Sequence, residues 1–303
     1  DDLRPAMGCY GDSYAITPNL DRLARRGIRF GQAHCQVAVC NPSRASLMTG
    51  LRPDTLGVWT LPIHFREAKP EAVTLPQWLR RHGYTAVSHG KIYHNPTPDP
   101  QSWSEPIRRV RAQQGYPRSV AAQIRAAQAK LPPQDWRKNN LRGPGSFATN
   151  VDGNKLVDGV NTSLTIDDLR RLGKTQQPFF VAMGFIRPHL PWIAPKKYWD
   201  LHDPQKLPVI TDGKVNANTP PYALSNSYEL THYVNLIDFP KPWDKRRIPE
   251  EQARRLMHAY YASVSFVDAQ IGRILAALDE EGLTDNTIIV LWSDHGWKLG
   301  EYN

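Results

Sequence analysis

A continuous apolar run at residues 178–185, Pro-Phe-Phe-Val-Ala-Met-Gly-Phe, most constrains the fold. A run of this length without polar alternation is typical of a central strand buried on both faces of a parallel sheet. Parallel strands need long crossover connections, which are usually helices. The run is far too short to span a bilayer, so no membrane span is expected.

Helical and strand patterns alternate along the rest of the chain. Helices are expected from Thr17, as N-cap, to Gly27, from Thr74 to Gly83, and from about Pro249 to Gly282. Further strands are expected over residues 28–30, 84–87 and 287–292. Residues 193–248 are interpreted as a proline-rich loop that forms part of a substrate wall. This order predicts an α/β fold with a mostly parallel central sheet flanked by helices.

The 303 residues are 40% hydrophobic, which is enough for a sizeable core. We expect one catalytic domain over residues 1–303, truncated at both ends, with an irregular basic insertion at about residues 95–150. Cys9, Cys35 and Cys40 are too few for a disulfide framework, and whether Cys9 and Cys35 pair stays open.

Positive charge is concentrated in one segment. The net charge is +9, and residues 101–150 hold nine Lys and Arg residues against Glu105 and Asp135. Such a segment favours polyanions, such as a sulfated polysaccharide, or is simply a solvated helix face. Nucleic-acid-binding motifs are absent, so no nucleic-acid partner is expected.

Cys40 lies at the predicted entrance of a short helix. Pro42 suits the first helical turn and Gly50 suits the position after the last. The unpaired N–H groups at a helix start favour anionic sulfur and anionic ligands, and Arg44 adds donors matched to tetrahedral oxyanions. A cysteine in this position can equally be a buried, inert residue.

The same stretch resembles a family motif. Cys40, Pro42, Ser43, Arg44, Thr49 and Gly50 match the Cys-x-Pro-Ser-Arg and Thr-Gly pattern of the type I sulfatases of the alkaline phosphatase superfamily. Residues 51–55, 260–265 and 295–297 resemble the iduronate-2-sulfatase-like branch. The resemblance implies that a formylglycine-generating enzyme oxidises Cys40 to formylglycine, and that a small C-terminal subdomain is missing. It also implies a periplasmic or secreted protein, or a lysosomal one in a eukaryote, although no leader is visible.

Several polar residues follow actual or implied strands, where open α/β sheets gather their chemistry. They are Asp1, Asp2, Lys91, His94, His189, Asp294 and His295. Each taken alone could be a turn, cap or surface residue, but each also matches the family pattern.

The resemblance assigns roles to these residues. Asp1, Asp2, Asp294 and His295, with the residue made from Cys40, would hold one divalent cation. Three carboxylates favour a hard ion such as Ca²⁺ over zinc. Arg44 and Lys91 would neutralise the sulfuryl oxygens, His189 would protonate the leaving sugar oxygen, and His94 would accept a proton from the aldehyde hydrate.

We therefore expect a sulfuric ester hydrolase acting on a sulfated saccharide, with a 2-O-sulfated uronic acid of a glycosaminoglycan-like polysaccharide as the favoured target. One alternative is a phosphonate monoester or phosphodiester hydrolase of the same superfamily. The other is a non-catalytic polyanion-binding protein on a sulfatase scaffold.

Overall fold

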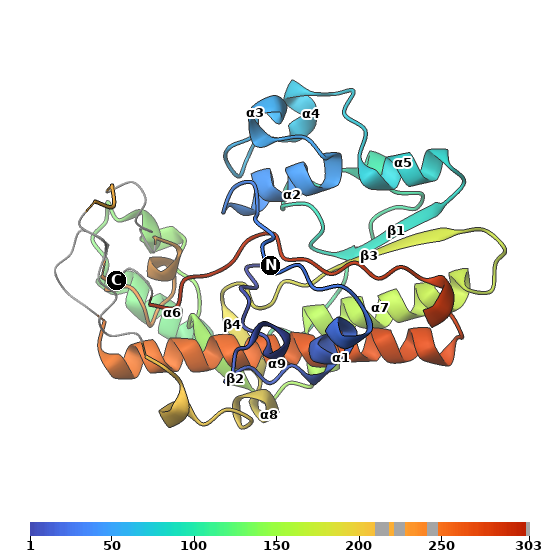
Figure 1. Ribbon diagram of the computed structural model, residues 1–303. Helices are drawn as coiled ribbons and strands as arrows, with labels where there is room; N and C mark the ends of the chain where they lie inside the picture. The colour runs from blue at the N-terminus through green and yellow to red at the C-terminus, as the bar shows by residue number, and fades with distance from the viewer. Residues whose placement is uncertain (210–217, 221–227, 241–247, 301–303) are drawn as a thin grey trace. The chain divides into compact units, whose positions relative to one another are not determined.

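The computed structural model describes residues 1–209, 218–220, 228–240 and 248–300 (Figure 1). The chain divides into two compact units. The first comprises Asp1–Gln113, Asp152–His189 and Val264–Trp297, and the second comprises Gln114–Val151, Leu190–Ser263 and Lys298–Asn303.

Two parallel strands lie at the centre of the first unit. Strand β1 (Thr85–Gly90) pairs with β3 (Phe179–Gly184), with Thr85 opposite Phe179 and Gly90 opposite Gly184. The predicted parallel strands and the α/β class are confirmed. The expected burial of residues 178–185 on both faces is wrong, because β3 is only half-buried along its length. Within the described residues it pairs with β1 alone, which leaves its other edge without a neighbouring strand.

Helices cover this pair of strands on both sides. In Figure 1, α2 (Cys40–Thr49) and α5 (Leu75–Arg81) lie above the strands and α7 (Val157–Leu172) lies below them. Helix α5 begins as predicted with Thr74, whose hydroxyl accepts from the Gln77 backbone in a capping box. The core above the strands consists of Ala45, Met48, Leu56, Val58, Phe65, Ala72, Ala86, Tyr93 and Trp103.

Helix α1 (Pro18–Arg26) is confirmed, but its predicted cap is wrong. Thr17 makes no capping bond, because its hydroxyl accepts from the Gly8 backbone and donates to Asp21. The carboxylate of Asp268 instead accepts the first amides of α1, from Asn19 at 3.1 Å and Leu20 at 2.8 Å. Asp268 belongs to α9 (Glu250–Glu280), the predicted long helix, and Gly282 follows it with a φ of 65°.

Short elements complete the first unit. They are η1 (Gly8–Tyr10), α3 (Pro53–Leu56), α4 (Phe65–Ala68), η2 (Pro100–Ser102), η4 (Gly153–Lys155) and η8 (Thr284–Asn286).

Two predicted strands do not form. Residues 28–30 and 287–292 have no regular secondary structure, and their apolar side chains face solvent, with Ile28 84% and Ile288 91% exposed. A strand requires a neighbour to accept and donate its backbone hydrogen bonds. Neither segment pairs with another described strand, so their apolar composition alone does not produce one.

The second unit contains β2 (Ser146–Thr149), which pairs in parallel with β4 (Trp192–Pro195). Its described residues form the helices α6 (Val120–Lys130), η3 (Trp136–Asn139), α8 (Lys196–Trp199), η5 (Pro204–Lys206) and η7 (Tyr228–His232), and the first part of α9. The predicted continuous loop over 193–248 is therefore wrong where β4, α8, η5 and η7 form. Its parts at 210–217, 221–227 and 241–247 lie outside the described residues.

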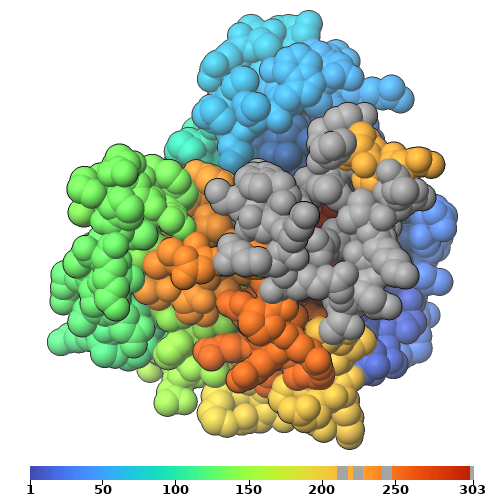
Figure 2. All heavy atoms as spheres, turned by 90° about the vertical axis from the view of Figure 1, so that its left-hand side faces the viewer, coloured from blue at the N-terminus to red at the C-terminus, as the bar shows by residue number. Residues whose placement is uncertain are grey.

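The basic segment contains α6 and η3 and is irregular over much of its length. Its residues, green at the left of Figure 2, reach the molecular surface. Arg108, Arg137 and Arg142 form ion pairs with carboxylates. Arg109, Arg111, Arg118 and Arg125 are exposed, and none of them forms an ion pair with a described residue.

No helix in the described part of the chain is both long enough and apolar enough to cross a membrane.

A buried hydrogen bond between Asp168 and His89 joins α7 to β1, and burial lowers the pKa of His89. The Oδ2 atom of Asp168 lies 2.7 Å from Nε2 of His89, and its Oδ1 accepts from Arg171 Nη2 at 2.7 Å. The Asp168 side chain is 2% exposed. Burial alone opposes its ionisation, but the bonds from Arg171 and His89 outweigh burial and hold the pKa of this carboxyl below its ordinary value.

We expect Asp168→Ala to lower the free energy of unfolding by about 3 kcal/mol at neutral pH, because it leaves buried donors without their acceptor. Since the folded pKa of Asp168 is depressed, its stabilisation is present above the unfolded pKa and is lost as the pH falls below about 4. Urea denaturation at pH 7 and at lower pH measures both effects. Asp167→Ala, at the exposed neighbouring position, is the control, and equal losses in the two variants would contradict the prediction.

Candidate active site

The start of α2 places four buried side chains together: Cys40, Asn41, Ser43 and Arg44. The helix begins after Val39, whose backbone is extended, and Pro42 occupies a position where its missing N–H costs little. It ends at Gly50, which adopts a φ of 70°. The predicted limits of this helix are confirmed.

A tight turn after β1 delivers Lys91. Gly90 has a φ of 73°, and a Cβ atom there would lie 2.0 Å from the carbonyl oxygen of Gly184. A Cβ on Gly184 would lie 2.1 Å from the Lys91 carbonyl oxygen. Only glycine fits at both positions, and the chain can therefore cross closely beside the end of β3.

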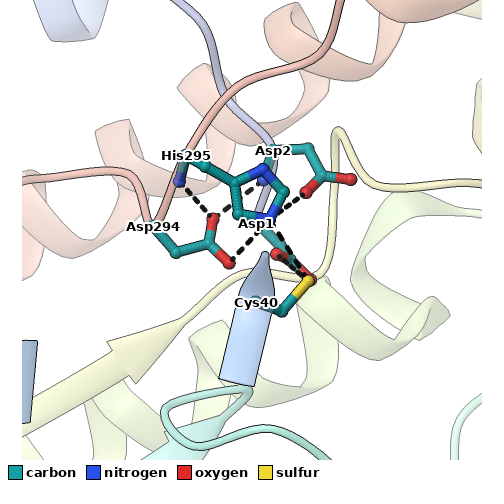
Figure 3. A group of neighbouring side chains, drawn as sticks. All are labelled: Asp1, Asp2, Cys40, Asp294 and His295. Atoms are coloured by element: carbon teal, nitrogen blue, oxygen red, sulfur yellow. Dashed lines mark hydrogen bonds and ion pairs between the residues drawn. The ribbon is translucent and has the colours of Figure 1, made fainter. Parts of the chain in front are cut away.

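Five side chains from three parts of the sequence converge on one point (Figure 3). They are Asp1, Asp2, Cys40, Asp294 and His295, and one ligand atom from each lies within 4.8 Å of all the others. The Cys40 sulfur lies 3.3 Å from His295 Nε2 and 3.5 Å from Asp1 Oδ1. His295 Nε2 also lies 3.1 Å from Asp2 Oδ1.

Arg44 connects these side chains to one another. Its Nε donates to Asp294 Oδ2 at 2.9 Å, and its Nη2 lies 3.2 Å from Asp1 Oδ1. Its Nη1 donates to the carbonyl oxygens of Lys91 and Ile92, the latter at 3.0 Å. Most of the guanidinium donors are thus used within the site.

The Asp294 carboxyl is ionised. Burial alone would raise its pKa, but the attraction of Arg44 and other nearby positive charges outweighs burial and holds the pKa well below its ordinary value. Its Oδ1 also accepts the backbone N–H groups of Asp2 and His295, both at 3.0 Å. Asp2 makes its contact from a left-handed backbone with a φ of 59°, a conformation that aspartate tolerates better than most residues.

The Cys40 thiol is not anionic. Burial raises its pKa to about 11, and the carboxylates of Asp2 and Asp294 act in the same direction. Lys91 Nζ, 3.9 Å from the sulfur, and Arg44 oppose this rise without cancelling it. The expectation that the helix start favours anionic sulfur is therefore wrong for the thiol, because burial among carboxylates dominates. A neutral thiol is a weak nucleophile.

Lys91 is itself buried and forms an ion pair with Asp1. Desolvation lowers the pKa of its ammonium group.

His189 and His94 are the two remaining histidines among the predicted site residues. His189 Nε2 is 3.6 Å from Asp2 Oδ2. His94 is half-buried, and its Nδ1 atom is buried without a hydrogen bond to any described residue. Burial, with the positive charges of Lys91 and Arg44, lowers the pKa of His94 to about 4, so its imidazole is neutral at pH 7.

The sequence assigns no role to Ser43 or Asn41, two residues at the start of α2. The Ser43 hydroxyl donates to the Asp294 carbonyl, and Asn41 bonds to the backbone of residues 60 and 63. Ser43 belongs to the matched motif, but its residue type did not indicate its distant partner.

The five converging groups fit a hard divalent cation. Ca²⁺–oxygen bonds of about 2.3–2.6 Å place opposite ligands about 5 Å apart, which accords with donor atoms lying within 4.8 Å of one another. The Nδ1 atom of His295 lies 3.2 Å from the Gly296 carbonyl oxygen, a contact that would hold the proton there and leave the Nε2 lone pair facing the cluster. Tetrahedral zinc sites use shorter bonds and favour nitrogen and sulfur ligands.

Comparison with known proteins identifies the family to which the chain belongs. A family model described as Sulfatase matches residues 1–303. The chain is 35% identical to iduronate 2-sulfatase of Mus musculus over 311 residues and 34% identical to that of Homo sapiens over 310 residues. Each alignment covers 100% of this chain and 54% of the relative, so the chain spans about half the length of these proteins.

Among solved structures, a phosphonate monoester hydrolase of Agrobacterium radiobacter matches with a TM-score of 0.65 and 23% identity. The match covers 99% of this chain and 62% of that one, and it shows a shared fold. With the family match extending over every residue, the chain belongs to the sulfatase family.

Proposed function

We propose that the protein carrying this chain hydrolyses sulfate esters of a sulfated saccharide, using formylglycine made from Cys40 and one Ca²⁺ ion. The observation that supports this most directly is the gathering of three carboxylates and an imidazole around the Cys40 sulfur, with two buried cationic side chains beside them. A formylglycine-generating enzyme would be the maturation partner. We place the protein in an exported or lysosomal compartment, as the family resemblance implies.

The cation would supply positive charge and Lewis acidity to the site. Oxidised Cys40 would supply a hydroxyl for attack on sulfur and a second one whose deprotonation releases sulfate, which neither cysteine nor serine offers. Asp1, Asp2, Asp294 and His295 would hold the cation in contact with that residue.

The protein's own charges would neutralise the sulfuryl oxygens. Lys91 lies 3.9 Å from the Cys40 sulfur, close enough to contact a group transferred there. Arg44 donates to Asp1 and Asp294, so its main task would be to orient the carboxylates rather than to bind sulfate with its full fork.

Two histidines would move protons. His189, which lies 3.6 Å from Asp2, would protonate the departing sugar oxygen. His94, which is neutral at pH 7 and has a buried nitrogen without a hydrogen-bond partner among the described residues, would accept a proton from the modified Cys40.

Similarity to two proteins named iduronate 2-sulfatase over the whole chain favours a 2-O-sulfated uronic acid as the target. The rival activity is hydrolysis of a phosphonate monoester or phosphodiester, and it predicts faster cleavage of a phosphodiester than of a sulfate ester. Rates on an aryl sulfate and on the matched aryl phosphodiester decide between them.

The mass of the proteolytic peptide containing Cys40, from full-length protein purified from its native host, tests the nucleophile. We expect the mass of an aldehyde in place of the thiol. Cys40→Ser should lower sulfate release on the order of a thousandfold or more, whereas Cys35→Ser, at an exposed cysteine, should leave it unchanged. An unmodified thiol in an active preparation would refute the mechanism.

Calcium should stabilise the protein. Saturation at about 100 times the dissociation constant adds about 2.7 kcal/mol to the free energy of unfolding, so chelation should lower the melting temperature and added Ca²⁺ should restore it. Asp294→Asn should abolish the calcium-dependent shift, while Asp285→Asn, at an exposed carboxylate, should preserve it. A larger shift with Zn²⁺ than with Ca²⁺ would contradict our choice of metal.

The exposed arginines of the basic segment support a second proposal, that this segment binds the polyanionic chain. Arg118→Gln with Arg125→Gln should reduce the salt concentration that elutes the protein from immobilised heparin, and should raise KM for polymer but not for a sulfated monosaccharide. Arg25→Gln with Lys174→Gln removes the same charge from other exposed positions and is the control. Heparin binding without any sulfate release would favour the non-catalytic alternative.

A further inference from the structure

The loop between α3 and α4 is fastened to the residue next to Cys40. Asn41 is buried, and its Nδ2 donates to the carbonyl oxygens of Thr60 at 3.0 Å and Ile63 at 2.7 Å. Val58 at the start of the loop is fully buried. Residues 59–62 therefore lie between two anchored positions. One is the buried Val58, and the other is the pair of hydrogen bonds to Asn41, the neighbour of Cys40 in the sequence.

Between these points the loop presents apolar side chains to solvent. Trp59 is 53% exposed and Leu61 is 43% exposed. The Trp59 indole N–H donates to Asp54 Oδ1 at 2.9 Å. This bond fixes the polar edge of the ring, so its orientation is set before any ligand arrives.

An exposed, oriented indole has no role in the core above the strands, whose own tryptophan, Trp103, is 4% exposed. Aromatic faces bind apolar surfaces by stacking, and a sugar ring offers such a surface in the C–H groups of one face. The charged cluster around Cys40 suits a sulfate, whereas the Trp59 ring suits an uncharged sugar face.

We propose that Trp59 and Leu61 form a subsite for the sugar linked to the sulfated residue. The inference rests on the proposed function, since it requires a sulfated saccharide at Cys40. Asn41 is a positioning residue that holds this subsite beside the site of sulfate transfer. The subsite makes an oligosaccharide a better substrate than the corresponding monosaccharide.

Two substrates distinguish an effect on binding at the subsite from an effect on sulfate transfer. One is a sulfated monosaccharide, and the other is a disaccharide that contains the same sulfated residue. Trp59→Ala should raise KM for the disaccharide about tenfold with little change in kcat, and should change neither constant for the monosaccharide more than about twofold. Trp59→Phe should recover part of the loss, because it restores an aromatic face. Trp78→Ala is the matched control, since Trp78 is 56% exposed on α5 and its ring lies against that of His82, with the two centroids 4.5 Å apart.

Binding is measured separately by calorimetry, with the sulfated disaccharide and a Cys40→Ala background that cannot turn over. Weaker disaccharide binding with Trp59→Ala, but not with Trp78→Ala, supports the subsite even if hydrolysis proves slow. Equal effects on both saccharides, or no effect of Trp59→Ala on disaccharide binding, would overturn the inference and leave the proposed hydrolysis intact. Absence of sulfate release from either saccharide by the wild-type protein would instead refute the proposed function.

Discussion

The candidate site depends on the guanidinium group of Arg44. It joins the carboxylates of Asp1 and Asp294 to the carbonyl groups that follow β1, and its own backbone belongs to α2. Four segments far apart in the sequence thus meet on one planar group. Because the pair with Asp294 is almost fully buried, removing either partner would leave an uncompensated charge in the interior. A lysine could not replace Arg44, since a single ammonium group cannot direct donors to three sides.

This connection explains how Asp294 reaches the cluster without the strand expected to carry it. Residues 287–292 are unpaired and exposed, yet Asp294 is 3% exposed and bonded to Arg44, Ser43 and the Asp2 backbone. The contacts at the site hold the segment in place, rather than the segment's secondary structure holding the site. Asp2 accepts an uncommon backbone conformation in the same arrangement, as residues at functional sites often do.

The sequence predicts the features that local chemistry decides. The α2 limits follow from Pro42 and Gly50, the start of α5 from Thr74, and strand β3 from its apolar run. It fails where a distant partner decides. Thr17 loses the capping role to Asp268, and residues 28–30 stay irregular without a neighbouring strand. The sequence also gives the wrong ionisation state for Cys40. A helix start favours a thiolate, but burial among carboxylates keeps the thiol neutral, and that burial is visible only in the folded structure.

Charge adds a constraint on the substrate. Three carboxylates at the site face two cationic side chains, Arg44 and Lys91. Cys40 and His94 are both neutral at pH 7, because the pKa of the thiol is raised and that of the imidazole is lowered. On the proposed function, a divalent cation and the proton that His189 would carry as the acid add positive charge to this single excess negative one, so the site would attract an anionic ester. Sulfate esters, phosphodiesters and phosphonate monoesters are monoanions, whereas a phosphate monoester at neutral pH carries nearly two charges. On the proposed function, the net charge of the site does not decide among these esters, so the choice falls to groups beyond the cluster, such as Trp59 in the loop to which Asn41 is bonded.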